Sequence, residues 1–297
     1  MGVWLEQLET ALLAPAHQLA LPEMLALWQH DDVVVMCRRP SDLEDCPDLP
    51  LRVRGALGNA LEVLAGDHKS DIFERPTAHR LLFKWQPPRG ISTPYVVRAE
   101  VRGDDVEVRV RLFGFAGFFS LTVLRGLVAA LEGGVSVRNH GVRARFAVQS
   151  ARIERFDGGG RLWPSEGSSA TLQLQTPVII RRGQHLRIEP VSLLRSALRR
   201  AQMIAPWMNC SLVCDEAAML RDAERFQFSM AGVYPESWSR TSRNNPGTPL
   251  PMNGYGGRVT IEGRLGEWAS YLDLAQFGSL GGECALGFGA VRVIIYP

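Results

Sequence analysis

The chain of 297 residues has almost no lysine: Lys69 and Lys84 are the only two, so nearly every basic side chain is an arginine. Arginine makes planar, bidentate contacts with phosphate and stacks on bases, whereas lysine acts as a point charge. The codon usage of a GC-rich genome would produce the same bias, and the formal net charge is only +2. The clustering of the arginines is therefore better evidence for an anionic partner than their number.

The sequence also has few cysteines, and it lacks long apolar runs and a basic N-terminal segment. The cysteine count is five, an odd number without the spacing of a disulfide framework, which favours reduced thiols. No uninterrupted apolar run approaches the roughly 20 residues of a membrane span. The first residues carry acids rather than the basic start of a signal peptide. We therefore expect a cytoplasmic protein that does not contact a membrane.

Motifs for metals and nucleotides are missing as well. Cys210 and Cys214 have the wrong spacing for a zinc knuckle and no partner pair, so they are interpreted as buried cysteines. The sequence has no Walker loop. Its carboxylates show no pairing that suggests a two-metal nuclease. We therefore predict neither a metal site nor a cofactor.

Strand and helix patterns alternate along both halves of the chain. In the first half, Val96–Val101 and Val106–Leu112 alternate apolar and polar residues around Gly103, which predicts a β-hairpin. The other elements expected there are one or two helices in 1–30, a strand over 32–37, a helix over 51–61, a helix from 112 to about 131, ended by Gly133 and Gly134, and a strand over 142–148.

The second half is expected to repeat this order. Its expected elements are a strand over 171–180, a helix over 190–206 with Arg195, Arg199 and Arg200 on its polar side, a helix over 214–226, a strand over 258–262, a helix over 265–276 and a last strand over 291–296. The repeated β–α–β–β–α–β order predicts an α+β fold of two tandem ferredoxin-like (RRM-like) domains, residues 1–156 and 170–297.

Two segments near the C-terminus suit a phosphate-bearing polymer. The first is a predicted loop, Arg240-Thr-Ser-Arg243-Asn244-Asn245, rich in arginine and amide side chains. The second is the glycine-rich loop from Gly278 to Gly289. Its glycines lack side chains, so a partner backbone can approach closely, and its N–H groups are expected to be exposed to phosphate.

These segments resemble a known family. The run GSLGGECALGFGAV, residues 278–291, resembles the C-terminal glycine-rich loop of the CRISPR-associated repeat-processing endoribonucleases, the Cas-six-like members of the RAMP superfamily. The upstream WSRTSRNN resembles the R-x-S-x-R-Q segment of one branch of that family. LRVRGALGNAL, FERP, TPYVV, LFGFA and GVRARF resemble further landmarks in the same order. The resemblance runs from about residue 31 to the end and leaves the first 30 residues unexplained.

The resemblance implies an activity. A family member of this kind would bind the CRISPR repeat stem-loop without a metal and cleave precursor RNA by attack of a ribose 2′-OH, leaving a 2′,3′-cyclic phosphate and a 5′-OH. It would stay bound to the 3′ hairpin of the crRNA, alongside other subunits of an effector complex. The general base of the family is often a histidine near the first strand–helix connection, which here is Arg38 to Arg54 and contains none.

Arginines therefore become the candidate catalytic groups, because guanidinium can stabilise the charged phosphorane although it is a poor base. Some type IV members of the family resemble such an arginine-based site. His30 would have to swing towards this region, and His68 and His79 are interpreted as incidental. The candidate catalytic residues are Arg38, Arg39 and Arg243. The candidate RNA-binding residues are Arg52, Arg54, His140, Arg195, Arg199, Arg240, Asn244, Gly281, Gly282 and Gly287.

Other interpretations fit the same residues. Ion pairing with Asp42, Glu44 and Asp45 would give Arg38 and Arg39 a structural role. A non-catalytic crRNA-binding subunit of an effector complex would share the fold, and the lack of a well-placed histidine favours it. A small-molecule-binding ferredoxin-like protein is the third alternative.

Overall fold

The computed structural model describes residues 3–40, 43, 46–66, 78–136, 143–158, 167–182, 185–186, 188–242 and 245–297. Contacts divide the chain into two compact units. Unit 1 comprises residues 1–18, 27–158 and 204–211, and unit 2 comprises 19–26, 159–203 and 212–297. The short segment 19–26 thus belongs to unit 2 although unit 1 flanks it in the sequence, and segment 204–211 belongs to unit 1 although unit 2 flanks it. Two three-residue strands, β1 (His17–Leu19) and β11 (Cys210–Leu212), pair with each other.

Unit 1 contains a four-stranded antiparallel sheet in the order β3-β4-β2-β7. Its main elements follow the expected β–α–β–β–α–β order: β2 (Gln29–Arg38), α3 (Leu49–Gly66), β3 (Tyr95–Arg102), β4 (Asp105–Phe113), α4 (Ser120–Gly133) and β7 (Ala147–Asp157). Smaller elements are α1 (Val3–Leu13), the π-helical η1 (Arg80–Lys84), the 3-10 helices η2 (Gly114–Phe119) and η3 (Ala205–Met208), and the pair β5 (Val135–Ser136) and β6 (Arg143–Ala144).

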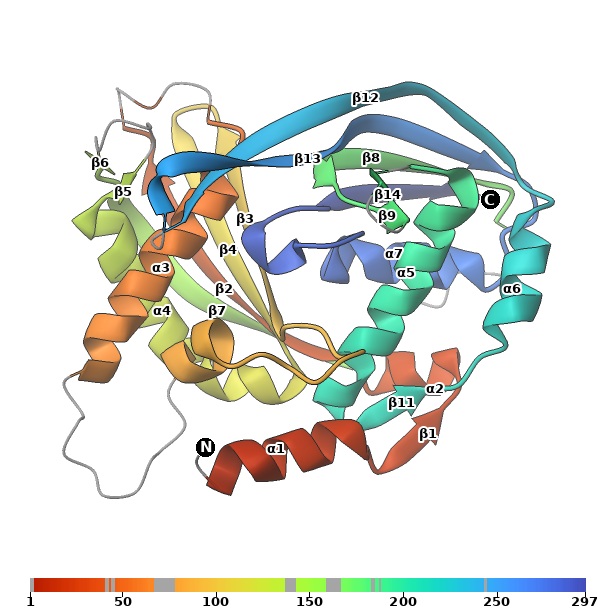
Figure 1. The fold of residues 1–297 in the computed structure, drawn as a ribbon, viewed down its shortest axis with the longest axis horizontal. Helices are drawn as coiled ribbons and strands as arrows, with labels where there is room; N and C mark the ends of the chain where they lie inside the picture. The colour runs from red at the N-terminus through yellow and green to blue at the C-terminus, as the bar shows by residue number, and fades with distance from the viewer. Residues whose placement is uncertain are drawn as a thin grey trace. The chain divides into compact units, whose positions relative to one another are not determined.

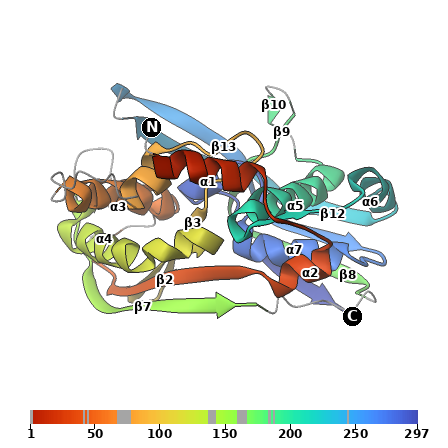
Figure 2. The same cartoon turned by 90° about the horizontal axis from the view of Figure 1, so that it is seen from below.

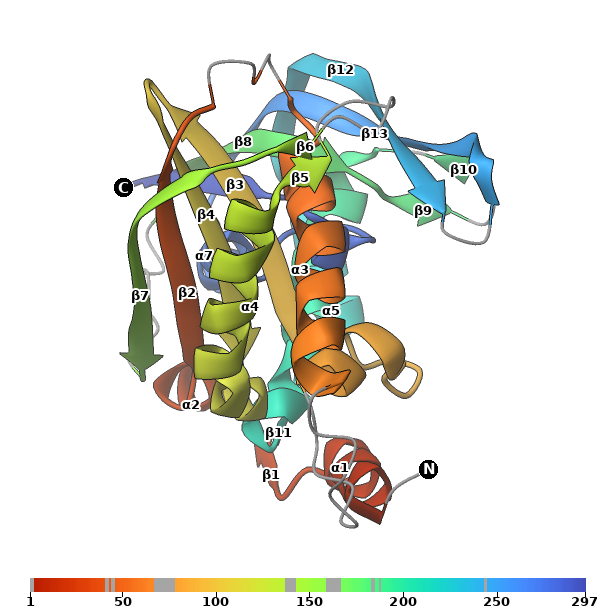
Figure 3. The ribbon, with the colours of Figure 1, turned by 90° about the vertical axis from the view of Figure 1, so that its left-hand side faces the viewer.

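Helices α3 and α4 lie side by side over one face of this sheet (Figure 3). Val33 and Val35 of the apolar run in β2 are buried on that face. The two helices approach closely because α4 has a glycine at the contact: a Cβ at Gly126 would lie 2.6 Å from Leu61 of α3. The β3–β4 hairpin turns at Gly103, whose φ of +62° suits glycine.

The opposite face of the sheet carries a buried charge network. Arg111 donates from Nε and Nη2 to the two carboxylate oxygens of Asp32, at 2.6 Å each. Arg109 also donates to Asp32 and to Glu154. Burial alone would raise the pKa of Asp32, but the hydrogen bonds and charge of Arg111 hold that pKa below its usual value. The bidentate pair ties β2 to β4, its neighbour in the sheet.

The predicted helix beginning at Leu112 is wrong at its start. Leu112 and Phe113 extend β4, η2 follows, and α4 begins at Ser120. Gly114 explains the break, because its φ is +49° and a Cβ there would lie 1.9 Å from the carbonyl oxygen of Trp207. The stretch Gly114–Gly133 has the length and apolar composition of one membrane-spanning helix among the described residues. In the fold it is η2 and α4, and α4 packs on β2 and β7.

Unit 2 repeats the topology, with an antiparallel sheet in the order β12-β13-β8-β14. Figure 2 shows its two longer helices, α5 and α7, on the same side of that sheet. Its main elements are β8 (Ser169–Val178), α5 (Pro190–Ile204), β12 (Gln227–Ser242), β13 (Asn245–Glu262), α7 (Trp268–Gly278) and β14 (Val291–Tyr296). Smaller elements are α2 (Leu21–Ala26), β9 (Arg181–Arg182), β10 (His185–Leu186), α6 (Glu216–Ala223) and η4 (Cys284–Leu286). Two tandem ferredoxin-like units are confirmed.

Of the two longest strands of unit 2, the sequence predicted only the end of β13, as the strand over 258–262. Strands β12 and β13 form a long hairpin (Figure 1), which takes up the described residues of the predicted loop, Arg240–Ser242 and Asn245. The loop prediction is therefore wrong for Arg240–Ser242 and Asn245, which are strand residues. β13 pairs with β8 only from Tyr255 onward. Before Tyr255, the hairpin arm is held by pairing between its own two strands.

The five cysteines are free thiols, as expected from their number and spacing. Cys37, Cys210 and Cys284 are buried, whereas Cys214, which was interpreted as buried, is only half-buried. Burial raises the pKa of the Cys210 thiol to about 11, so this thiol stays protonated at neutral pH.

Candidate functional site

Arg38 and Arg39 lie at the end of β2 and differ in their surroundings. The Arg38 side chain is 63% exposed and makes a surface ion pair of 3.4 Å with Asp104. Arg39 is half-buried, and its Nε and Nη2 donate to the carbonyl oxygen of Leu43 at 3.3 and 2.8 Å. Arg38 can therefore turn to a phosphate at little cost, because exposed ion pairs are weak. Arg39 is engaged in holding the backbone after β2.

Arg52 and Arg54 lie in the first two turns of α3. Arg52 pairs with Asp48 at 2.8 Å and donates to the carbonyl oxygen of Ser136 at 3.2 Å. Arg54 donates to the Tyr95 hydroxyl at 3.3 Å, and its guanidinium lies 4.9 Å from the centre of the Phe83 ring. Both guanidinium groups thus have structural partners in unit 1.

His79, interpreted from the sequence as incidental, lies in this region. The His79 ring stacks on Phe83 with a centroid distance of 6.1 Å, so His79 and Arg54 contact the same aromatic ring. His79 lies 25 residues after Arg54 in the sequence, and nothing in the local pattern connects them. The two residues come together only because η1 packs against α3. This packing is close, since a Cβ at Gly58 of α3 would lie 2.9 Å from the Phe83 side chain.

Three candidate residues, Arg243, Asn244 and His140, lie outside the described residues. The same holds for the FERP landmark and for His68. Their roles stay predictions from the sequence.

Helix α5 presents both of its candidate RNA-binding arginines to solvent. Arg195 and Arg199 are exposed, one turn apart, and both face Glu216 at 3.8 and 3.5 Å. The expectation that Arg200 lies on the same polar side is wrong. Arg200 is buried, and its Nε donates to the carbonyl oxygen of Gly278 at 2.6 Å. It therefore binds the C-terminal end of α7, where the helix dipole favours a cation.

Arg240 lies on β12, opposite Leu250 of β13, on the arm of the hairpin that β8 does not pair with. Trp238, two residues earlier, and Phe288 of the glycine-rich loop carry aromatic rings of the kind that can stack on a base. Both are buried, and their ring centroids are 4.6 Å apart. These two rings anchor the hairpin to the glycine-rich loop and are not available to a base.

The glycine-rich loop folds tightly on its own unit. The N–H of Gly281 donates to Ser196 Oγ at 2.7 Å, that of Gly282 to the Ile179 carbonyl at 2.8 Å, and that of Gly287 to the Cys284 carbonyl at 3.0 Å. The expectation that these three N–H groups are exposed to phosphate is therefore wrong. The glycines admit a close backbone, as predicted, but that backbone is the protein's own.

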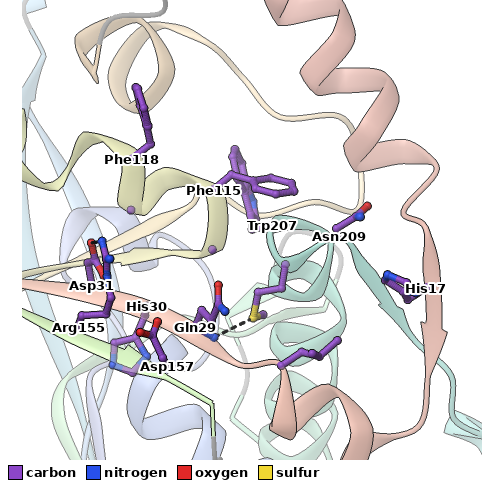
Figure 4. Close-up of a pocket in the computed structure, with 14 residues that line it drawn as sticks. His17, Gln29, His30, Asp31, Phe115, Phe118, Arg155, Asp157, Trp207 and Asn209 are labelled. Atoms are coloured by element: carbon purple, nitrogen blue, oxygen red, sulfur yellow. Dashed lines mark hydrogen bonds and ion pairs between the residues drawn. The ribbon is translucent and has the colours of Figure 1, made fainter.

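Unit 1 also contains a pocket of about 660 Å³ (Figure 4). Phe115 and Phe118 of η2 line one side, and Asp31, Arg155 and Asp157 of the strands line another. Ser120 Oγ donates to the Asp31 carboxylate at 2.6 Å, and Arg155 pairs with it at 3.1 Å. Asp31 therefore already has two partners from unit 1.

His30 is held rigidly in this pocket. Its ring is buried, stacks on Phe156 at 4.8 Å and accepts a hydrogen bond from Trp28 Nε1. Eight residues along a strand separate it from Arg38, a distance of about 26 Å. The possibility that His30 swings towards Arg38 is therefore excluded.

The buried His30 predicts a pH-dependent stability. Burial, and then the positive charge of Arg111, lower the pKa of His30 from 6.5 to about 3. The unfolded chain binds the proton below about pH 6.5 and the folded chain does not, so stability is full above 6.5 and is lost as pH falls towards 3. We expect a loss of about 1.4 kcal/mol per pH unit in this window. Denaturant unfolding of wild type and His30→Gln between these pH values checks this, since the variant should show a flatter profile.

Among the residues that the structure describes, no group of three His, Cys, Asp or Glu side chains is arranged to hold a metal ion. The ionisable groups of the candidate site are mainly arginines, which are not metal ligands at neutral pH.

Comparisons with known proteins agree with the resemblance found in the sequence. The family model of the CRISPR-associated endoribonuclease Cas6 matches residues 172–291. This range includes β8 from residue 172 onward, the β12–β13 hairpin, α7 and the glycine-rich loop. No curated protein matches the chain significantly.

Solved structures of Cas6 proteins share the fold over nearly the whole chain. A Thermus thermophilus Cas6 is 13% identical, covers 90% of this chain and 99% of its own, and gives a TM-score of 0.55. Two Cas6 product complexes are 19% and 17% identical. They cover 90% and 91% of this chain and 99% and 100% of their own, with TM-scores of 0.52 and 0.53. At these identities the likeness concerns the fold alone, and the type IV assignment stays a prediction.

Proposed function

We propose that this chain, a Cas6-type protein by its fold and by its C-terminal sequence, binds the stem-loop of a CRISPR repeat RNA and cleaves the precursor RNA there. The observation that carries the proposal is the Cas6 family match over residues 172–291, which covers the hairpin and the glycine-rich loop. The product complexes among the similar structures support an RNA ligand for this fold.

Unit 2 supplies exposed cations for the RNA backbone. Arg195 and Arg199 share one carboxylate partner, Glu216, so the local charge is positive. Arg240, with Arg243 and Asn244 beyond it in the sequence, would contact the RNA from the hairpin. Gly281, Gly282 and Gly287 serve this site through packing rather than by donating to phosphate. Gly281 and Gly282 hold the loop against α5 and against Ile179, the residue after β8, and the N–H of Gly287 bonds within the loop.

Cleavage without a metal requires a group that stabilises the charge on the pentacoordinate phosphorus. Arg38 is the best-placed candidate of the β2–α3 region, because its exposed guanidinium has only a surface ion pair to give up. Arg39 would position the segment after β2 through its bonds to Leu43. Arg52 would orient the start of α3 through Asp48.

His79 offers a second candidate centre. It is the one described histidine shown to contact the same ring as a candidate RNA-binding arginine, Arg54. An imidazole can take the 2′-OH proton, which guanidinium cannot do at neutral pH. This centre would pair His79 as the base with Arg54 at the phosphate.

The decisive experiment uses purified protein and a labelled repeat RNA in excess EDTA. We expect cleavage at the unchanged rate, because no step depends on a metal. A copy of the RNA with a single 2′-deoxy nucleotide at the cut site should bind equally well and remain intact, because the attacking oxygen is missing. The product ends are checked by kinase labelling of the 5′-OH without prior phosphatase treatment, by resistance of the 2′,3′-cyclic phosphate to 3′-end ligation, and by mass spectrometry.

Two results would contradict the enzyme assignment. Cleavage of the deoxy substrate at the same position would exclude 2′-OH attack. Tight binding without cleavage of either RNA would leave the non-catalytic alternative, a crRNA-binding subunit of an effector complex. For the cleaving enzyme and for the non-catalytic subunit alike, we propose that the protein stays bound to the 3′ hairpin of the crRNA and contacts other subunits of such a complex.

A further inference from the structure

The pocket of unit 1 is not used by either of the proposed catalytic centres. It is lined mainly by η2, by the residues where β2 begins and β7 ends, and by η3 (Figure 4). All of its lining residues belong to unit 1. Its volume of about 660 Å³ is within the range of sites that hold an organic ligand, roughly 300–1,000 Å³. The chemistry of the lining therefore indicates which ligand would bind.

The carboxylates of the pocket outnumber its guanidinium group by two to one. Arg155 donates from Nε and Nη2 to the two carboxylate oxygens of Asp31, at 3.1 and 3.3 Å. The second carboxylate, that of Asp157, has no hydrogen bond or ion pair with a described residue. His30 does not change this balance, because burial and the charge of Arg111 lower its pKa to about 3. Such a lining attracts a cation and repels the phosphates of RNA.

Aromatic rings form another side of the pocket (Figure 4). Phe115 and Phe118 of η2 are 45% and 84% exposed, although phenylalanine is usually buried. The face of a phenyl ring carries negative charge density and attracts an ammonium or guanidinium group within about 6 Å of its centre. Leu27 and Met208 add apolar lining. An alkyl chain with a cationic end would therefore find a carboxylate, aromatic rings and an apolar wall in one pocket.

We propose that this pocket binds an organic cation, an alkyl chain that ends in an ammonium or guanidinium group. Asp157 would pair with the cationic end, and Phe115 and Phe118 would contact it through their ring faces. Free polyamines and the lysine or arginine side chains of another protein share this chemistry. The proposal goes beyond RNA cleavage and does not depend on it, so each can fail without the other.

A methionine of the pocket can report binding. Met208 lines the pocket, and its sulfur accepts a hydrogen bond from the Gln29 backbone N–H at 3.4 Å. The RNA-free full chain is labelled with carbon-13 at the methionine methyl groups, and the variant Met208→Leu identifies the signal. Each probe is titrated to about 20 mM, because one side chain in an open pocket is expected to bind with a millimolar dissociation constant.

Four probes separate a cation site from other kinds of site. The tripeptide Leu-Arg-Leu with blocked ends and spermidine represent the two sources of the cation. Both should shift the Met208 signal saturably, and the tighter of the two identifies the source. The same tripeptide with citrulline, whose neutral urea group has the shape of guanidinium, should bind roughly five-fold more weakly or less. Adenosine 5′-monophosphate, which stands for an RNA nucleotide, should not bind.

Two variants test the residues of the proposed site. Asp157→Asn keeps the shape and removes the charge, and should weaken the arginine tripeptide roughly five-fold. Asp222→Asn, at an exposed carboxylate of unit 2, is the matched control and should bind as wild type does. Phe118→Ser should weaken the peptide roughly three-fold or more while the thermal midpoint of unfolding stays unchanged, since the side chain is exposed.

Four outcomes would overturn the proposal. The first is the absence of a saturable shift with both cations, and the second is equal affinity for the arginine and citrulline tripeptides. The third is an unchanged affinity in both Asp157→Asn and Phe118→Ser, which would place binding elsewhere. The fourth is tighter binding of adenosine 5′-monophosphate than of the cations, which would make the pocket a nucleotide site.

Discussion

Replacing Arg38 by alanine is expected to lower the rate of cleavage of bound repeat RNA by roughly 10²–10³-fold. The loss should appear in the rate of the bound complex rather than in affinity, because this guanidinium is proposed to act on charge that develops only in the transition state. Single-turnover cleavage at saturating protein, with binding measured in parallel, separates the two quantities.

The chain offers a matched control. Arg225 of unit 2 is 82% exposed and makes a surface ion pair of the same 3.4 Å length, with Asp222. Arg225→Ala should therefore cleave as wild type does. If Arg38→Ala also cleaves normally while His79→Ala loses roughly 10²–10⁴-fold, the catalytic centre lies at Arg54 and His79 instead. Loss in neither variant would contradict both centres.

Replacing Gly289 by alanine is expected to destabilise unit 2 by at least roughly 3 kcal/mol. The φ of Gly289 is +72°, and an added Cβ would lie 1.8 Å from the carbonyl oxygen of Leu280, whose N–H donates to the Gly289 carbonyl. Backbone must move to relieve this contact, and the loop would lose its pairing with β8. Equilibrium unfolding in denaturant, followed by tryptophan fluorescence, measures the loss.

Gly282 in the same loop provides the comparison. Its φ is not in the left-handed region, and an added Cβ would come no closer than 3.7 Å to the Ile179 carbonyl. Gly282→Ala should change the unfolding free energy by less than about 1 kcal/mol. Equal effects of the two substitutions would mean that the loop is not held by the close backbone contact at Gly289.

Part of the candidate site was accessible from the sequence because it depends on local signals. The arginines on α5 follow helical spacing, and Arg195 and Arg199 are exposed as predicted. Arg200, the residue after Arg199, was misassigned. Each residue advances about 100° around a helix, so Arg200 points in another direction, and its hydrogen-bond partner, Gly278, lies 78 residues away in the sequence. Likewise, no local signal connects His79 to Arg54.

By itself, the sequence determined the order of the main elements in the first half, and it predicted two ferredoxin-like units. The apolar run of β14 even marked both ends of that strand, Val291 and Tyr296. Only the tertiary structure revealed the β12–β13 hairpin. In the sequence, Pro249 and Pro251 argue against a strand, and only the fold shows that β12 pairs with these residues. It also decided which N–H and guanidinium groups have partners inside the protein. Periodicity is a property of neighbouring residues, whereas hydrogen-bond partners come from segments far apart in the chain, and only the folded backbone brings them together.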